Sequence, residues 1–127
     1  MNPIGPKASE AEVQANLTLA ASKVGWRLFR NNVGVLVNER GIPIRFGLAN
    51  VSKQVNSHIK SGDLIGIRPV IITPDMVGQT IGQFVSLECK RPGWKFNPND
   101  ERDVAQKRWA DLITSLGGYA KITMGEL

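Results

Sequence analysis

The chain has 127 residues, of which 42% are hydrophobic, 6% aromatic and 21% charged, enough for one domain with its own core. No apolar run approaches the ~20 residues that a membrane helix needs, and the first residues lack the apolar stretch of a secretory signal. The single cysteine, Cys89, and the single histidine argue against a disulfide framework, a Cys/His metal cluster and a Cys–His or Ser–His catalytic pair. The net charge of +5 does not by itself identify a partner.

The chain opens with a segment that predicts no regular structure, and a helix follows it. Residues 1–8 are rich in proline and glycine and are expected to be flexible, which leaves 9–127 as a single domain. Ser9 stands before two acidic residues, as an N-cap does, and apolar residues then recur at helical spacing. Because Gly25 closes this pattern, the sequence predicts a helix over about 9–24.

Short β-type runs fill the middle of the chain. They predict five strands, over 26–30, 33–37, 42–46, 64–67 and 83–90. Turn residues separate the first three runs, which favours a meander. Residues 47–62 are polar and leave a long loop and a short helix both open. An excursion over 75–82 is expected to include a turn of helix near Met76.

The last part of the chain predicts a second long helix and a final strand. Between 100 and 116, five apolar residues fall on one stripe at helical spacing: Ala105, Trp109, Leu112, Ile113 and Leu116. Two glycines end this segment, and 119–123 has the pattern of a strand. The fold class predicted from this order is α/β, with a mixed central β-sheet flanked by helices.

Glu88 and Lys90 stand two residues apart in the predicted strand 83–90. Side chains alternate along a strand, so the two share one face, roughly 6.6 Å apart along the chain. An ordinary half-exposed strand has the same pattern. Asp63 opens the strand 64–67 and would converge with Glu88 if the two strands pair, although alone it fits the end of a turn. Two such carboxylates with water ligands suit Mg²⁺ or Mn²⁺.

Several short motifs, in their joint order and spacing, resemble one known family. They are Glu10 and Gln14 as E-x-x-x-Q, Arg30 to Gly34 as R-x-N-x-G, Asp63 in GDLIGI, Glu88 and Lys90 in FVSLECKRPG, and Gln106 sixteen residues beyond the lysine. The family is the VRR-Nuc (virus-type replication-repair nuclease) branch of the PD-(D/E)xK superfamily, and the resemblance covers about residues 9–124. The chain departs from the family in a longer stretch over 48–61 and a long excursion over 69–83.

The resemblance implies a restriction-endonuclease-like core that holds Mg²⁺ or Mn²⁺. Asp63 and Glu88 would bind the metal together with the backbone carbonyl of Cys89. An acid on the first helix would complete the cluster, directly or through water. Glu10 is favoured because it lies one turn before Gln14, while Glu12 stays open as the alternative.

The resemblance also implies how the phosphodiester bond is hydrolysed. Lys90 would help position the attacking water and stabilise the charge of the transition state, and Gln106 would orient that water or Lys90. The metal would lower the pKa of the bound water and neutralise charge on the scissile phosphate. Catalysis of this kind needs no nucleophilic side chain.

The charge balance favours a polyanionic partner once the proposed metal ligands are set aside. Assigning three of the 11 acidic residues to the metal leaves eight against 16 basic ones, a balance of +8, or +7 without Lys90. The candidates for phosphate contacts are Arg30, Arg45, Lys95, Arg102, Lys107 and Arg108. Trp94 either stacks on a base or packs against its own domain.

In the family that these motifs resemble, stand-alone members look like homodimers that cut branched DNA such as four-way (Holliday) junctions, as in DNA repair. The resemblance therefore implies a homodimeric, structure-selective DNA endonuclease in the cytoplasm, of the host cell if the protein is viral, with no membrane partner. Two alternatives stay open: a catalytically silent DNA-binding module on the same fold, and a small interaction protein with ordinary strand ends. Cleavage that depends on Mg²⁺ or Mn²⁺ separates the enzyme from both.

Overall fold

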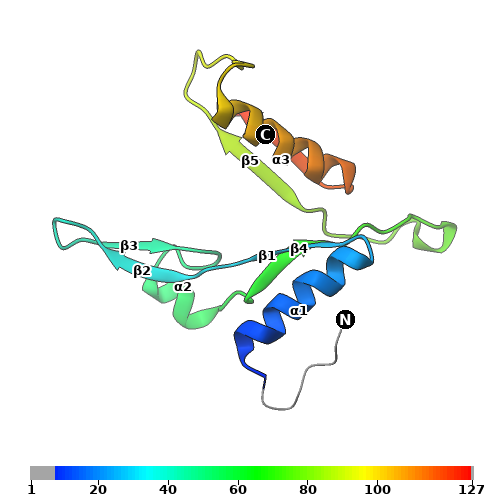
Figure 1. Cartoon of the computed structure of the whole chain (residues 1–127), viewed down its shortest axis with the longest axis horizontal. Helices are drawn as coiled ribbons and strands as arrows, with labels where there is room; N and C mark the ends of the chain where they lie inside the picture. Colours follow the sequence, from blue (N-terminus) through cyan, green and yellow to red (C-terminus); the bar gives the residue numbers. More distant parts are fainter. Residues whose placement is uncertain (1–7, 127) are drawn as a thin grey trace. The chain divides into compact units, whose positions relative to one another are not determined.

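The computed structural model describes residues 8–126 and divides them into two units, 8–66 and 67–126. Each unit contains both helices and strands, so the chain belongs to the mixed α/β class, as the sequence predicts (Figure 1). The predicted flexible segment 1–8 lies, up to residue 7, outside the described residues. The prediction of a single domain over 9–127 stays a prediction.

Helix α1 (Glu10–Lys23) opens the first unit within one residue of its predicted bounds. The Ser9 hydroxyl accepts a hydrogen bond from the Glu12 N–H at 3.2 Å, which satisfies one of the free donors of the first turn. At the other end Gly25 has a φ of 87°, and the Trp26 N–H donates to the Ala21 carbonyl at 2.9 Å. Both ends of the helix are therefore set by the residues that the sequence pattern identifies.

Strand β1 (Arg27–Arg30) pairs with β4 (Leu64–Ile67) and not with its sequence neighbour. The predicted meander of the first three strands is therefore wrong at β1. A Cβ on Gly66 would lie only 2.0 Å from the Arg27 carbonyl oxygen, so the two backbones approach more closely than any side chain allows. This glycine is the physical reason that β4 fits against β1.

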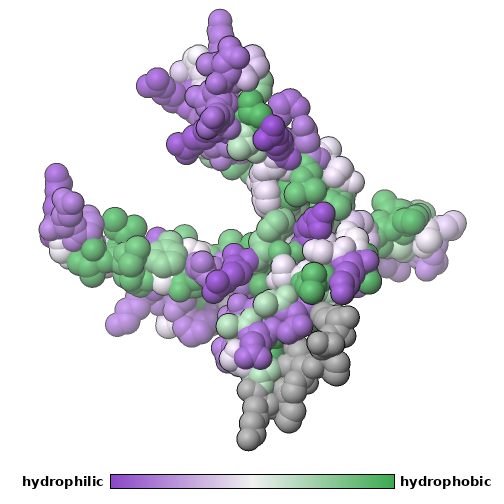
Figure 2. Space-filling view, in the orientation of Figure 1, coloured by the Kyte–Doolittle hydropathy of each residue, from purple (hydrophilic) through white to green (hydrophobic). Residues whose placement is uncertain are grey.

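Strands β2 (Gly34–Val37) and β3 (Pro43–Phe46) form an antiparallel hairpin, as the sequence predicts for this pair. Gly34 lies opposite Phe46, and a Cβ on Gly34 would lie 2.6 Å from the Phe46 ring, which therefore covers the glycine. Apolar side chains remain on the surface of the hairpin, with Leu36 66% exposed (Figure 2). The first unit thus places apolar groups on a ribbon only two strands wide.

The open segment 47–62 contains a short helix, α2 (Lys53–His58). The Ser52 hydroxyl accepts from the Val55 N–H at 3.1 Å, which is the N-cap contact of that helix. Of the two possibilities for this segment, the structure shows the helix. The predicted turn of helix near Met76 is also present, as the 3₁₀-helix η1 (Pro74–Met76).

The second unit is built from β5 (Val85–Cys89), α3 (Glu101–Ser115) and β6 (Tyr119–Thr123). The two strands are parallel and run in register from Val85 opposite Tyr119 to Cys89 opposite Thr123. Parallel strands need a crossover connection, and α3 is that connection. Gly118 is buried where a Cβ would lie 2.7 Å from Ile113 and 3.0 Å from Ile67, so these residues pack closely beneath the helix.

The inward face of α3 differs in part from the predicted apolar stripe. Ile113 is fully buried, as expected, but Ala105 is exposed. Asp103, a charged residue outside the stripe, is only 7% exposed. The later part of the stripe is thus confirmed, whereas the first two turns of α3 face the polar side chains of Glu88 and Lys90 in place of an apolar surface.

The strands form three separate pairs among the residues that the structure describes: β1–β4, β2–β3 and β5–β6. The predicted mixture of parallel and antiparallel pairing is present, while the hydrogen bonds join these pairs into no larger sheet within residues 8–126. None of the helices described is long and apolar enough to cross a lipid bilayer.

Candidate active site

Strand β5 places Glu88 and Lys90 on the same face. The Lys90 Nζ lies 3.9 Å from the Glu88 Oε1, and the Lys90 N–H extends the strand ladder by donating to the Thr123 carbonyl at 2.8 Å. This face of β5 meets α3, where the Trp109 indole N–H donates to the Ser86 hydroxyl at 2.8 Å. Because side chains alternate along a strand, the contact at Ser86 sets the side on which the later even-numbered residues point.

Helix α3 brings Gln106 to the carboxylate of Glu88. The Gln106 Nε2 donates to the Glu88 Oε1 at 2.9 Å, joining two residues that are 18 positions apart in the sequence. The other end of this amide, Oε1, is buried and has no hydrogen-bond partner among the described residues. Buried carbonyl oxygens are normally satisfied by a donor, so this oxygen is suited to accept from a water beside Glu88.

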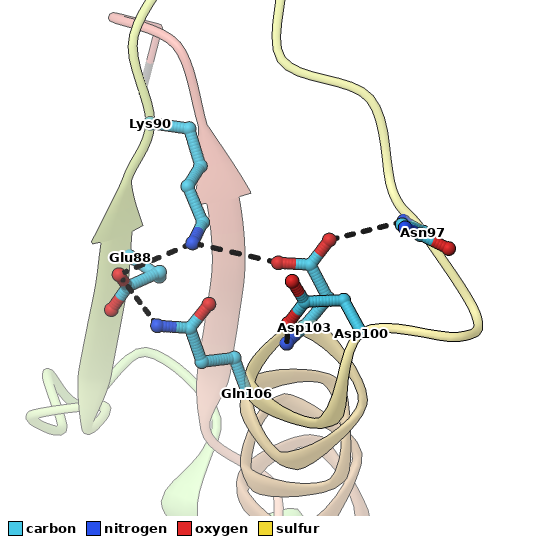
Figure 3. A network of polar contacts seen from close by, with 6 residues as sticks. All are labelled: Glu88, Lys90, Asn97, Asp100, Asp103 and Gln106. Carbon is cyan, nitrogen blue, oxygen red and sulfur yellow. Dashed lines mark hydrogen bonds and ion pairs between the residues drawn. The ribbon is translucent and has the colours of Figure 1, made fainter.

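Lys90 is enclosed by three groups of the second unit, of which Figure 3 shows Glu88 and Asp103. Its ammonium lies 3.9 Å from Glu88, 3.8 Å from the Asp103 Oδ1 and 5.4 Å from the centre of the Trp94 ring. The side chain is only 14% exposed. The ammonium is therefore held between two carboxylates, with an aromatic ring on a further side, and this position restricts its motion.

Strand β5 presents two kinds of oxygen donor beside Lys90. Both contacts of Glu88 use Oε1, which leaves Oε2 without one of these contacts, and the side chain is 40% exposed. The Lys90 N–H points toward β6, and backbone groups alternate in direction along a parallel strand, so the Cys89 carbonyl points away from β6. Carboxylate and carbonyl oxygens are the ligands that Mg²⁺ prefers.

The remaining predicted ligands belong to the first unit. Asp63 is exposed and directly precedes β4, as the sequence predicts, and its carbonyl accepts from the Asn31 N–H at 2.9 Å. The Asn31 side chain donates to the Ser61 hydroxyl at 2.7 Å and to the Gly62 carbonyl at 2.8 Å. The loop before Asp63 is thus fastened to the end of β1. That Asp63 lies close to Glu88 stays a prediction.

The choice of the acid on the first helix stays open. Glu10 is the first residue of α1 and Glu12 lies in the same turn, and both side chains are exposed. Gln14, one turn beyond Glu10, is half-buried. Within either unit, the described residues contain no group of three or more His, Cys, Asp or Glu side chains gathered as a metal site.

The predicted phosphate-binding residues differ in what their side chains already contact. Arg45 is half-buried, and its guanidinium donates to the Asn50 carbonyl at 3.1 Å and to the Asn50 side-chain oxygen at 2.7 Å. Lys107 pairs with Asp111 at 2.8 Å on the surface of α3. The other candidates are exposed: Arg30, Lys95, Arg102 and Arg108. These four exposed cations remain the better candidates, because binding a phosphate would not require them to break a contact of the kind that Arg45 and Lys107 make.

The sequence prediction missed Asp103, which contacts the proposed catalytic lysine. It stands three residues before Gln106, so the two share a face of α3. The three-residue spacing between Asp103 and Gln106 is the signal that could have identified it. An acid in the first turn of a helix is, however, usually explained by the helix dipole alone. Asp103 also accepts from the Asn97 N–H at 3.0 Å, which ties down the loop that carries Trp94.

Three comparisons with known proteins identify no relative. No family model matches the chain, and no curated protein or solved structure matches it either. The case for a function therefore depends on the residues of the site and on the resemblance of their motifs.

Proposed function

We propose that the chain is a divalent-metal-dependent, structure-selective DNA endonuclease of the VRR-Nuc type, with a PD-(D/E)xK core. The observation that supports this most strongly is the contact of Glu88, Lys90 and Gln106, three residues from two elements that the resemblance assigns to one site. In metal-assisted phosphodiester hydrolysis a carboxylate can hold the metal and an ammonium can stabilise charge on the phosphate, while the buried oxygen of Gln106 can accept from a water.

Each of these side chains has a distinct task in the proposed reaction. Lys90 donates hydrogen bonds to the scissile phosphate and stabilises the negative charge that grows on it in the transition state. Gln106 accepts from the attacking water through Oε1 while Nε2 holds the carboxylate of Glu88. The water therefore meets the phosphate with its orientation already fixed.

The metal would be Mg²⁺ or Mn²⁺. Glu88 and the Cys89 carbonyl would hold it, and the resemblance adds Asp63 and either Glu10 or Glu12 as further ligands. The bound cation would supply a water of lowered pKa and neutralise charge on the phosphate. The partly exposed carboxylate of Glu88 and the Cys89 carbonyl, which points away from β6, support this assignment.

The proposed substrate is branched DNA, with a four-way junction as the leading candidate. Lys95, Arg102 and Arg108 are exposed on α3 and the loop before it, and they would contact backbone phosphates without reading sequence. Two copies related by a two-fold axis would present two sites to the two strands of a junction. The cytoplasm is the compartment in which we propose that the enzyme acts, with a role in DNA repair.

The direct test is a cleavage assay on matched DNA structures. We expect wild-type protein to cut a four-way junction more than duplex, flap or splayed-arm DNA in Mn²⁺, and to stop when a chelator is added. Lys90→Ala should lower the rate by about 10²–10³-fold, because one transition-state donor is lost. Lys53→Ala, which removes an exposed lysine of α2 that no motif assigns to the site or to phosphate, is the matched control.

Two results would contradict the proposal. Full activity of Lys90→Ala would show that Lys90 takes no part in the reaction. Tight binding of the junction without cleavage, with Mn²⁺ or with chelator, would make the protein a DNA-binding module on the same scaffold. The proposed homodimer is tested separately, by sedimentation equilibrium, in which a mass that stays near 13.9 kDa at micromolar concentration would exclude it.

A further inference from the structure

Asp103 is a buried carboxylate whose two oxygens have different partners. It is 7% exposed, and Oδ2 accepts from the Asn97 N–H at 3.0 Å, whereas Oδ1 faces the Lys90 Nζ at 3.8 Å. Its own N–H donates to the Asp100 Oδ1 at 2.9 Å. The side chain is thus anchored by the loop on one side and presents its other oxygen to the lysine (Figure 3).

A buried carboxylate is costly unless a positive group or several donors compensate for it. The Asn97 N–H supplies one donor, which is the contact expected of an acid that only fastens a loop to a helix. The second oxygen is not required for that purpose. Because Lys90 is itself only 14% exposed, each of the two charged groups serves as the other's compensation.

We infer that Asp103 is a positioning residue that holds the ammonium of Lys90 at the candidate active site. A lysine side chain has four rotatable bonds and orders only where partners restrain it. Glu88 restrains the ammonium from its own strand, and Asp103 restrains it from α3. The inference rests on the proposed function for its catalytic consequence, but the contact itself can be measured without any reaction.

Trp94 belongs to the same arrangement. Its ring lies 5.4 Å from the Lys90 Nζ, and it is carried by the loop that Asp103 fastens at Asn97. Asp103 therefore acts on the lysine directly through Oδ1 and indirectly through the position of the aromatic ring. Neither route places Asp103 in contact with DNA, so its loss should change the rate of the chemical step and leave substrate affinity unchanged.

The test combines steady-state and single-turnover cleavage of a four-way junction in Mn²⁺ with urea unfolding of the same variants. Asp103→Asn keeps an oxygen for the Asn97 N–H and removes the charge that faces Lys90. Asp111→Asn is the charge-matched control on α3, and Asp100→Asn is the control for the helix start, where asparagine caps equally well. Lys90→Met and Lys90→Met/Asp103→Asn complete a double-mutant cycle.

We expect Asp103→Asn to lower kcat about tenfold with KM changed less than twofold, while both control variants keep wild-type kcat. In unfolding, the double variant should be less destabilised than the sum of its two single variants. A wild-type kcat in Asp103→Asn, or additive destabilisation in the cycle, would overturn the inference. If the wild type cleaves no DNA while the cycle still shows coupling, the proposed function fails, and with it the catalytic part of this inference.

Discussion

Helix α3 takes part in two Lys–Asp pairs that differ in their surroundings more than in their chemistry. Lys107 and Asp111 both lie on its outer face, 2.8 Å apart, with side chains that are 56% and 66% exposed. Asp103 lies on its inner face, 3.8 Å from Lys90 at the end of β5, and the side chains of Lys90 and Asp103 are 14% and 9% exposed. The shorter contact is thus the one in water, and the longer contact is the one shielded from it.

This difference shows that distance alone does not rank ion pairs. An exposed pair at helical spacing contributes about 0.3–0.5 kcal/mol, because water screens the charges and both side chains lose freedom. Breaking a buried pair by removing one partner costs about 3–5 kcal/mol, since the other charge is left uncompensated. A pair of the second kind is stable only when the fold fixes both partners, which is also what a catalytic group requires.

The largest expected effect is on catalysis. Lys90→Met should reduce the single-turnover rate about 10²–10³-fold, because the transition state loses a positioned charge. Lys107→Met removes the same charge from the outer face of α3. At saturating DNA its rate should stay within about twofold, because the loss of a phosphate contact weakens binding and leaves the chemical step unchanged. Quench-flow or gel-based single-turnover assays measure both rates. An equal loss of rate in the two variants would mean that the net charge of the protein, and not the position of the lysine, governs cleavage.

The next effect is on stability. Asp103→Ala should lower the free energy of unfolding by about 3 kcal/mol, because Lys90 loses its inner-face partner and the Asn97 N–H loses its acceptor. Asp111→Ala should cost about 0.5 kcal/mol or less. Urea unfolding followed by tryptophan fluorescence measures the free energy of unfolding of both variants. An equal loss at the two positions would mean that shielding from water does not distinguish the two ion pairs.

A smaller effect is expected at Gln106, the neighbour of Asp103 on the inner face. Gln106→Leu removes the hydrogen bond to Glu88 but also removes the buried oxygen that has no described partner, so stability should change by less than about 1 kcal/mol. The cleavage rate should nevertheless fall about tenfold, because the water loses its acceptor. A variant that unfolds easily and still cleaves at the wild-type rate would assign Gln106 to the fold alone.

The two ion pairs should also respond differently to salt. Raising the ionic strength from about 0.1 to 1 M shortens the screening length from about 10 to 3 Å. The small cost of Asp111→Ala should then vanish, while the cost of Asp103→Ala should persist, since shielded charges are screened less. Repeating the urea titrations at the two salt concentrations tests this, and an equal loss at both positions would place Lys90 and Asp103 in contact with bulk solvent.

Local signals in the sequence were sufficient for the elements that hold the site. Ser9 and Asp100 act as the N-caps of α1 and α3, and β6 has the predicted bounds 119–123. The shared face of Glu88 and Lys90 follows from the period of a strand, which no tertiary contact can change. These features depend on residues a few positions apart, and the pattern contains all of the necessary information.

Long-range partners were predicted less well. Nothing near β1 in the sequence indicates that it pairs with β4, because the deciding feature is the space beside Gly66, 36 residues beyond Arg30. Asp103 was missed for a related reason. Its place at the start of a helix has a sufficient local explanation, and only the packing of α3 against β5 shows that its carboxylate also meets Lys90.

The central claim, that Glu88 holds a divalent cation beside Lys90, is tested most directly by calorimetric titration with Mn²⁺. We predict that the wild type binds Mn²⁺ and that Glu88→Gln abolishes the binding. Asp63→Asn, at the further ligand that the motifs assign, should abolish it as well. Glu101→Gln, at an exposed acid in the first turn of α3, should leave the binding unchanged. Binding that survives Glu88→Gln, or a wild type that takes up no Mn²⁺, would contradict the claim.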